Sequence, residues 1–229
     1  MKSSTAVLAT LLLAAQPAIA APVTVSGLNV DFTYDDLLLG LYGTPTVFND
    51  SIYFTPVAFE ATSLDGTGSG FSSSTINIKV TPKAGFDLDS VALIEHGDYL
   101  LLGSGAAVYA TGQLSVFDLA APGVITTAGI ASSPTTTTGS LESWSAFSGV
   151  DLDTPGWVPG AGINLTIKNL LLATTASPGS VADISKTYVG ASFDASPVPE
   201  TSKSALMLAG IGLIGFVVHR RARNPGSVL

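Results

Sequence analysis

Hydrophobic and polar residues alternate along much of the chain between residues 21 and 195, and this pattern limits the fold more than any other feature. In 75–80 every second residue is Ile or Val, with Asn77 and Lys79 between them, and 163–167 repeats the alternation. Side chains two residues apart lie on the same face of a β-strand, so each segment predicts a strand with one buried face. Helical spacing extends over no more than two turns in this range, which favours an all-β domain.

Seven further segments also have the composition of strands, and they lie at 23–34, 51–61, 90–96, 99–102, 107–117, 124–127 and 186–193. Stretches rich in Gly, Thr and Pro separate many of them, and Gly97-Asp98 predicts a hairpin corner. About nine short strands at this spacing predict an antiparallel β-sandwich over 21–195, with a jelly-roll or an immunoglobulin-like strand order.

Charge excludes one large class of partner. All 17 acidic residues lie between Asp31 and Glu200, whereas the range 21–200 holds only four lysines and no arginine, a formal charge of −13. Such a surface repels phosphate, so nucleic acid is not expected as a partner. The chain has no cysteine, which excludes disulfides, zinc-thiolate sites and thiol catalysis. No cofactor is predicted.

The N-terminus has the layout of a secretory signal peptide. A lysine precedes the apolar run 6–15, and the small residues Ala18 and Ala20 stand just before Ala21. This order of charged, apolar and cleavage-site segments predicts a signal helix over 1–20 that signal peptidase removes. The mature chain is then expected to be exported and to begin at Ala21.

The C-terminus predicts a single transmembrane helix over 204–218, followed by a basic cytoplasmic tail over 219–229. The fifteen residues of the apolar run carry no charge, and Arg220, Arg221 and Arg223 follow it closely. A helix of this length measures about 22 Å, shorter than the roughly 30 Å hydrocarbon layer, so the basic residues at both ends would have to snorkel. The arginines are expected to stay in the cytoplasm.

A proline-rich linker over 196–203 precedes this helix and contains Val198, Pro199 and Glu200. The order of Pro-Glu motif, short polar stretch, Gly-rich apolar helix and Arg cluster resembles the PEP-CTERM sorting signal. Thr201 stands where that signal has its second proline. Prolines keep the segment extended, which suits binding by a protease at the membrane surface.

The resemblance implies how such a chain is handled. PEP-CTERM proteins are substrates of exosortase, a membrane protease-transpeptidase of Gram-negative bacteria that make exopolysaccharide. The chain would be anchored in the inner membrane by its helix, cut near Glu200, and delivered to the cell envelope or the extracellular matrix. The expected partners are signal peptidase, exosortase, the membrane before processing and, as an open possibility, exopolysaccharide.

Catalytic residues are not predicted. His96 is the only histidine of the domain, and no Gly-x-Ser-x-Gly segment supplies a nucleophile for it. Carboxylate pairs such as Glu95 and Asp98 leave a glycan-active enzyme as an alternative, since two carboxylates can cleave a glycosidic bond. A further set of four acidic residues could instead hold calcium, namely Asp87, Asp89, Asp151 and Asp153.

Aromatic residues raise a different alternative, a carbohydrate-binding module. Trp157, in a loop between two prolines, is the candidate for stacking on a sugar ring, although anchoring of its own loop explains it as well. The other aromatic residues considered for such a platform are Trp144, Tyr42, Tyr53 and Tyr109. The leading prediction is a non-enzymatic, exported β-sandwich with a structural or interaction role in the envelope or an exopolysaccharide biofilm matrix.

Overall fold

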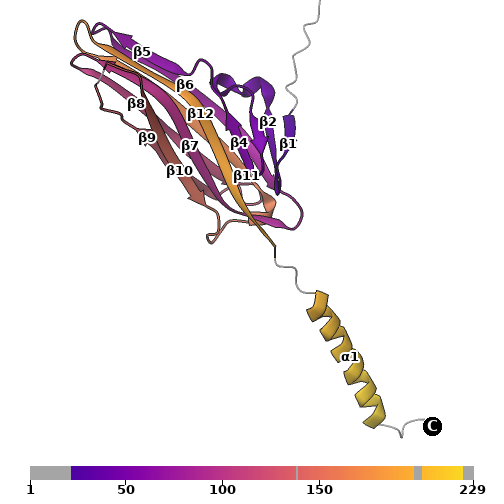
Figure 1. The fold of residues 1–229 in the computed structure, drawn as a ribbon. Helices are drawn as coiled ribbons and strands as arrows, with labels where there is room; N and C mark the ends of the chain where they lie inside the picture. Colours follow the sequence, from indigo (N-terminus) through magenta and orange to yellow (C-terminus); the bar gives the residue numbers. More distant parts are fainter. Residues whose placement is uncertain (1–21, 138, 199–202, 224–229) are drawn as a thin grey trace, which may run out of the picture.

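The structure of the protein is a computed structural model, and it describes residues 22–137, 139–198 and 203–223. Its strands form two antiparallel sheets that pack face to face, with the strands running along the long direction of the molecule (Figure 1). This architecture confirms the predicted all-β antiparallel sandwich.

Each sheet contains six strands. Sheet A has the order β1 (Pro22–Ser26), β2 (Val30–Asp35), β6 (Gly68–Pro82), β11 (Ile163–Thr175), β8 (Ala106–Asp118), β9 (Ile125–Ser132). Sheet B has the order β10 (Glu142–Asp151), β7 (Phe86–Leu102), β12 (Val181–Pro197), β4 (Ser51–Phe54), β3 (Thr46–Phe48), and β5 (Glu60–Leu64) also pairs with β12. Within the described part of the chain, short 3₁₀ helices lie at Asp36–Leu38, Gly40–Tyr42 and Pro159–Ala161.

The core lies between the sheets and is built by the predicted alternation. Ile76, Ile78 and Val80 of β6 are buried, and Leu165 and Ile167 of the neighbouring β11 are buried in register with them. Aromatic rings fill the centre, where Tyr42 makes edge contacts with Phe54 and Phe59. Burial of this continuous apolar layer supplies the main driving force for folding.

The predicted hairpin corner at Gly97-Asp98 is wrong, because β7 runs without a break from Phe86 to Leu102. Gly97 lies on the inner face, where an added Cβ would meet the indole of Trp144 and the carbonyl oxygen of Ser185. The glycine therefore permits close packing inside a strand instead of marking a turn.

The strand β10 was not predicted at all, and β6 begins at Gly68, inside a stretch that composition assigns to a loop. In β10 the inward residues are Trp144, Ala146, Ser148 and Val150, so small and polar residues weaken the alternation. Pairing with β7 over its whole length stabilises this strand despite its weak pattern.

The C-terminus forms the helix α1, which extends from Lys203 through Arg223, whereas the sequence predicted a transmembrane helix over 204–218. Figure 1 shows it beyond the end of β12, apart from the sandwich. Among the residues that the structure describes, no helix combines the length and the apolar character needed to cross a membrane. The predicted signal helix, with Ala18, Ala20 and Ala21, lies outside the described residues.

Candidate functional site

The outer face of sheet B contains a groove lined by residues from four strands. The groove measures about 260 Å³, and its lining residues are Phe48, Ser51, Tyr53, Ile94, Tyr188, Gly190, Ala191 and Ser192. They come from β3, β4, β7 and β12. We call this feature the aromatic groove.

A β-bulge places Tyr188 in this groove. The register between β12 and β7 shifts between Lys186 and Tyr188, so Thr187 is an extra residue in β12. Lys186 consequently points into the sandwich, whereas Tyr188 lies on the outer face two residues later. Bulges commonly re-aim side chains in this way.

Aromatic rings form a continuous strip across three strands. The rings of Tyr53 and Tyr188 are nearly parallel, with 24° between their planes and 6.3 Å between their centroids. On the other side of Tyr188 the ring of His96 lies 5.8 Å away, tilted by 38°. Gly190 makes room for this arrangement, because an added Cβ would lie 2.5 Å from the Tyr188 hydroxyl.

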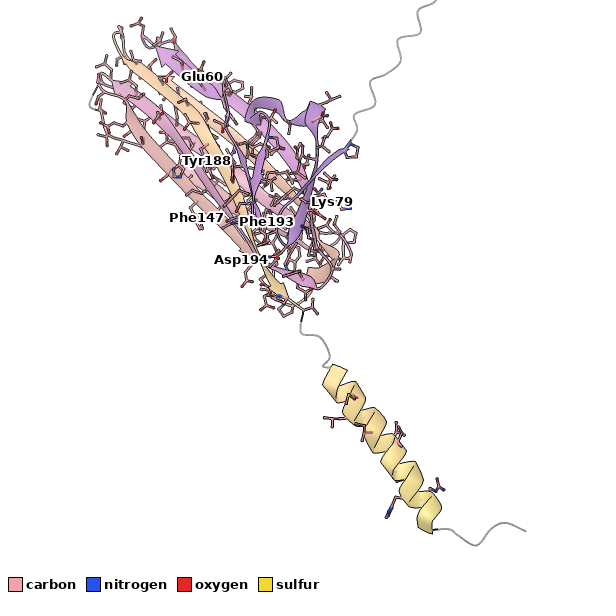
Figure 2. All side chains as sticks on the ribbon, turned by 45° about the vertical axis from the view of Figure 1, so that its right-hand side comes forward. Glu60, Lys79, Phe147, Tyr188, Phe193 and Asp194 are labelled. Atoms are coloured by element: carbon pink, nitrogen blue, oxygen red, sulfur yellow. The ribbon has the colours of Figure 1, made fainter. Side chains whose placement is uncertain are left out.

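Large apolar side chains flank the strip without being covered. Phe147 is 69% exposed, Phe48 is 65% exposed and Ile94 is 39% exposed. Phe147 is the register partner of Ile94, which pairs in turn with Gly190. Figure 2 shows Phe147 and Tyr188 on one side of the sandwich and Lys79 on the other. Contiguous apolar patches of this kind mark binding surfaces in exported and soluble proteins.

The opposite, inner face of the same strands carries a buried ion pair. The ammonium of Lys186 donates to the Glu95 carboxylate at 2.5 Å, and both side chains are 1% exposed. Asn169 of the facing sheet donates to the other oxygen of Glu95 at 2.6 Å and to the Tyr42 hydroxyl at 3.0 Å. Tyr42 donates in turn to the carbonyl of Ile167 at 3.1 Å.

Aromatic rings enclose the cation of this pair, with the Lys186 ammonium 5.3 Å from the ring centroid of Phe59 and 5.6 Å from that of Trp144. Burial lowers the pKa of Lys186, although the Glu95 carboxylate raises it in part. Burial and the same carboxylate also raise the pKa of Tyr42. Lys186, Glu95 and Tyr42 are buried in the core and linked to one another directly or through Asn169, so the network contributes to structure.

Trp157 is held by its loop and packs, partly buried, against the core. The buried carboxylate of Asp118 accepts hydrogen bonds from the backbone N–H groups of Ala120, Ala121 and Val158, which joins two loops next to this tryptophan. Burial acts to raise the pKa of Asp118, but these three donors outweigh it and leave the pKa lowered. These contacts favour the loop-anchoring alternative for Trp157.

The structure shows hydrogen bonds for two of the four acidic calcium candidates, and calcium binding by them stays a prediction. Within residues 22–137, 139–198 and 203–223, no group of three or more His, Asp or Glu side chains could hold an ion. Asp151 accepts the backbone N–H of Asp153 at 2.9 Å, and Asp89 accepts the hydroxyl of Ser196 at 3.0 Å. Asp151 thus stabilises the turn after β10, and Asp89 links β7 to β12. The carboxylate pair Glu95 and Asp98 is also separated, because Glu95 is buried inside and Asp98 lies on the outer face.

The sorting-motif residues fall at the edge of the described chain. Val198 follows β12, is 41% exposed, and donates its N–H to the carbonyl of Gly85. Pro199 and Glu200 lie outside the described residues. Arg220 is exposed on α1, and Arg221 and Arg223 belong to the same helix.

Sequence reasoning found one residue of the groove, Tyr53, and missed Tyr188, Ile94 and Phe147. Of the other aromatic candidates, Tyr42 and Trp144 are buried in the core, and Tyr109 lies on sheet A. The segment Tyr188-Val189-Gly190 is a local sequence signal for the groove. Val189 points inward, so the ring of Tyr188 and the glycine beside it lie on the same outer face. The β-bulge at Thr187 determines which of these side chains point outward, and no residue pattern in the sequence predicts that bulge.

No protein-family model matches the chain, and no curated protein matches it. Among solved structures it is similar to that of infectious bursal disease virus Gt strain, at 14% identity over 96% of this chain and 55% of the viral chain, with a TM-score of 0.26. It is also similar to a structure of carbohydrate-binding modules from the β-sandwich superfamily, at 10% identity over 78% of this chain and 87% of that chain, with a TM-score of 0.20. The chain thus spans about half the length of the viral chain. TM-scores this low carry no argument about ligand or function.

Proposed function

We propose that the protein is an exported, non-enzymatic β-sandwich that is sorted through its C-terminal tail and resides in the cell envelope or an exopolysaccharide matrix. Signal peptidase would remove residues 1–20, and α1 would attach the unprocessed chain to the inner membrane. Exosortase would then cut near Glu200 and release the sandwich from this helix. The role of the sandwich is structural or interactive.

The observation that carries the proposal is the uncovered apolar surface of α1. Leu208, Ile211, Leu213, Ile214 and Phe216 are all exposed. At 100° per residue these positions are spread around the whole helix, so no single face could dock on the sandwich and bury them all. A helix segment with apolar side chains on every side is stabilised by an apolar environment, which contact with lipid or with a membrane protease would provide.

The order of the tail also supports processing. Arg220 is exposed near the C-terminal end of α1, where it can reach lipid headgroups. Val198, which follows β12 and precedes α1 in the sequence, is also exposed. The cleavage segment would lie between a strand that ends at Pro197 and a helix that starts at Lys203, so a cut there would leave β12 and α1 whole.

The intact mass of the protein tests this proposal, measured from cells and from medium with and without the host's exosortase. We expect a species extending from Ala21 to about Glu200 only where exosortase is present. The double variant Pro199→Ala, Glu200→Ala should remain uncut, whereas Thr201→Pro, which completes the Pro-Glu-Pro motif, should be cut at least as well. A product that retains residues 204–223 in both strains would overturn the proposal.

A second candidate function is carbohydrate binding by the sandwich itself, and the aromatic groove favours it. The alternative of a glycan-active enzyme has no comparable support, because Glu95 and Asp98 lie on opposite faces of β7 and Glu95 is committed to Lys186. Cleavage of a glycosidic bond needs two carboxyl groups facing one substrate.

A further inference from the structure

We propose that the aromatic groove binds a neutral oligosaccharide segment, with the rings of Tyr53 and Tyr188 as the surface on which sugar rings stack. This inference rests on the second candidate function, carbohydrate binding, and is independent of how the tail is processed. It assigns the ligand to the outer face of sheet B and not to the loop of Trp157.

The two tyrosines supply the flat surface that a sugar needs. Their rings are nearly parallel and adjacent, and both line the groove. One face of a pyranose ring presents C–H groups, which pack on aromatic rings, while the tyrosine hydroxyls can hydrogen-bond at the edge. His96 extends this surface on the β7 side of Tyr188.

Polar groups lie beside this surface where ligand hydroxyls would need partners. Ser51 and Ser192 are opposite each other in the register of β4 and β12, and both line the groove. A serine hydroxyl both donates and accepts a hydrogen bond, as a sugar hydroxyl does. A few placed polar groups on a mostly apolar surface are the usual composition of a ligand site.

The groove crosses the strands, which suits an extended chain. Phe147, Ile94, Gly190 and Tyr53 occupy one registered row over β10, β7, β12 and β4. Three steps between neighbouring strands at about 4.8 Å each make this row about 14 Å long. Phe147 lies beside the groove in this row, and Phe48 lines the groove on β3.

Charge selects the type of saccharide. None of the described residues that line the groove is charged, although the range 21–200 carries −13. The surrounding acidic surface repels anionic polysaccharides and nucleic acids, and the groove has no cation to bind them. Neutral polysaccharide is the ligand that matches these electrostatics.

Affinity electrophoresis of the full-length protein in mild detergent tests the inference. The probes are neutral galactomannan, xyloglucan and mixed-linkage β-glucan, with alginate as an anionic polysaccharide. We expect at least one neutral probe to retard the protein and alginate not to. Tyr53→Ala and Tyr188→Ala should each weaken association about tenfold, which corresponds to the loss of one good aromatic contact.

Phe71→Ala is the matched control, because Phe71 is an exposed aromatic residue on the outer face of sheet A. It should leave the retardation unchanged, and thermal melting should confirm that all three variants fold.

Absence of retardation by every neutral probe overturns the inference together with carbohydrate binding. Retardation that is lost in Phe71→Ala but kept in the tyrosine variants overturns the inference alone. Dimerisation abolished by Tyr188→Ala, without retardation, would assign the groove to a second copy of the chain and also overturn it.

Discussion

The two faces of sheet B depart from the usual burial of side chains in opposite ways: the inner face buries two charged residues, and the outer face exposes large apolar ones. On the inner face Glu95 and Lys186, two charged residues, are sealed among aromatic rings and paired with each other. On the outer face Phe147 and Phe48, two large apolar residues, are exposed. A single extra residue in β12, Thr187, separates the buried Lys186 from the outward Tyr188.

The contrast indicates that the inner face of sheet B contributes to stability and that its outer face is available for binding. The inner charges are compensated, so removal of one partner leaves the other without a counter-ion in the core. The outer rings have no partner within the described residues of the sandwich apart from one another, so their removal costs the fold little. Variants on the inner face should change the free energy of unfolding, and variants on the outer face should change binding.

The largest effect is expected for Lys186→Met. It removes the cation and leaves the Glu95 carboxylate buried without its partner, which typically costs about 3–5 kcal/mol of unfolding free energy. The double variant Glu95→Leu, Lys186→Met removes both charges and should recover most of that loss. Urea unfolding measures the unfolding free energy of both variants. If the single and the double variant lost the same amount, the unpaired Glu95 carboxylate would not be the cause of the loss.

A smaller loss is expected for Gly97→Ala, also on the inner face. The new methyl group would meet the Trp144 indole and the Ser185 carbonyl, and overpacking of this kind typically costs about 1–3 kcal/mol. Gly129→Ala, on an open surface of β9, is the matched control and should be neutral or slightly stabilising. Equal melting temperatures for the two variants would contradict the close packing around Gly97.

Asp118→Asn tests the polar link between loops at the end of the sandwich. Loss of the charge weakens three hydrogen bonds from backbone N–H groups and should cost about 1–3 kcal/mol at pH 7. The folded pKa of Asp118 lies below its unfolded value, so this stabilisation is complete above about pH 4 and is lost as the pH falls through the folded pKa. The difference between wild type and variant should therefore shrink in acid, and a constant difference down to pH 2 would contradict this.

The smallest effect on stability is expected for Gly190→Ala, which lies on the outer face. The added methyl group would meet only the end of the Tyr188 side chain, which can move, so the unfolding free energy should change by less than about 0.5 kcal/mol. Displacement of this ring should nevertheless weaken retardation by neutral polysaccharide. Gly129→Ala again serves as the control, and unchanged binding by Gly190→Ala would contradict the role of Tyr188.

Sequence patterns predicted the sandwich because most of its strands alternate strictly, as 75–80 and 163–167 do. They failed at Gly97, where a glycine that permits packing against Trp144 has the same local appearance as a turn residue. They also missed β10, whose inner face includes Ala146 and Ser148 among the larger residues.

The candidate site was harder to predict than the fold. Its residues come from 48–53, 94 and 188–192, and only strand pairing brings these segments together. The bulge at Thr187 reverses the direction of the following side chains, and no local residue pattern announces it. Trp157 was the predicted sugar contact because it is a large ring in a loop. In the structure Asp118 accepts a hydrogen bond from the N–H of Val158 in that loop, and Trp157 packs against the core.

Ring resonances of the full-length protein in detergent micelles test the central claim most directly, because they report on each face separately. During titration with an oligosaccharide from the neutral polysaccharide that retards the protein most, the ring signals of Tyr53, Tyr188 and Phe147 should shift. Those of Phe71 and Tyr109, on sheet A, should not. Shifts confined to Phe71 and Tyr109, or no shift of any ring at saturating oligosaccharide, would contradict the assignment of binding to the outer face of sheet B.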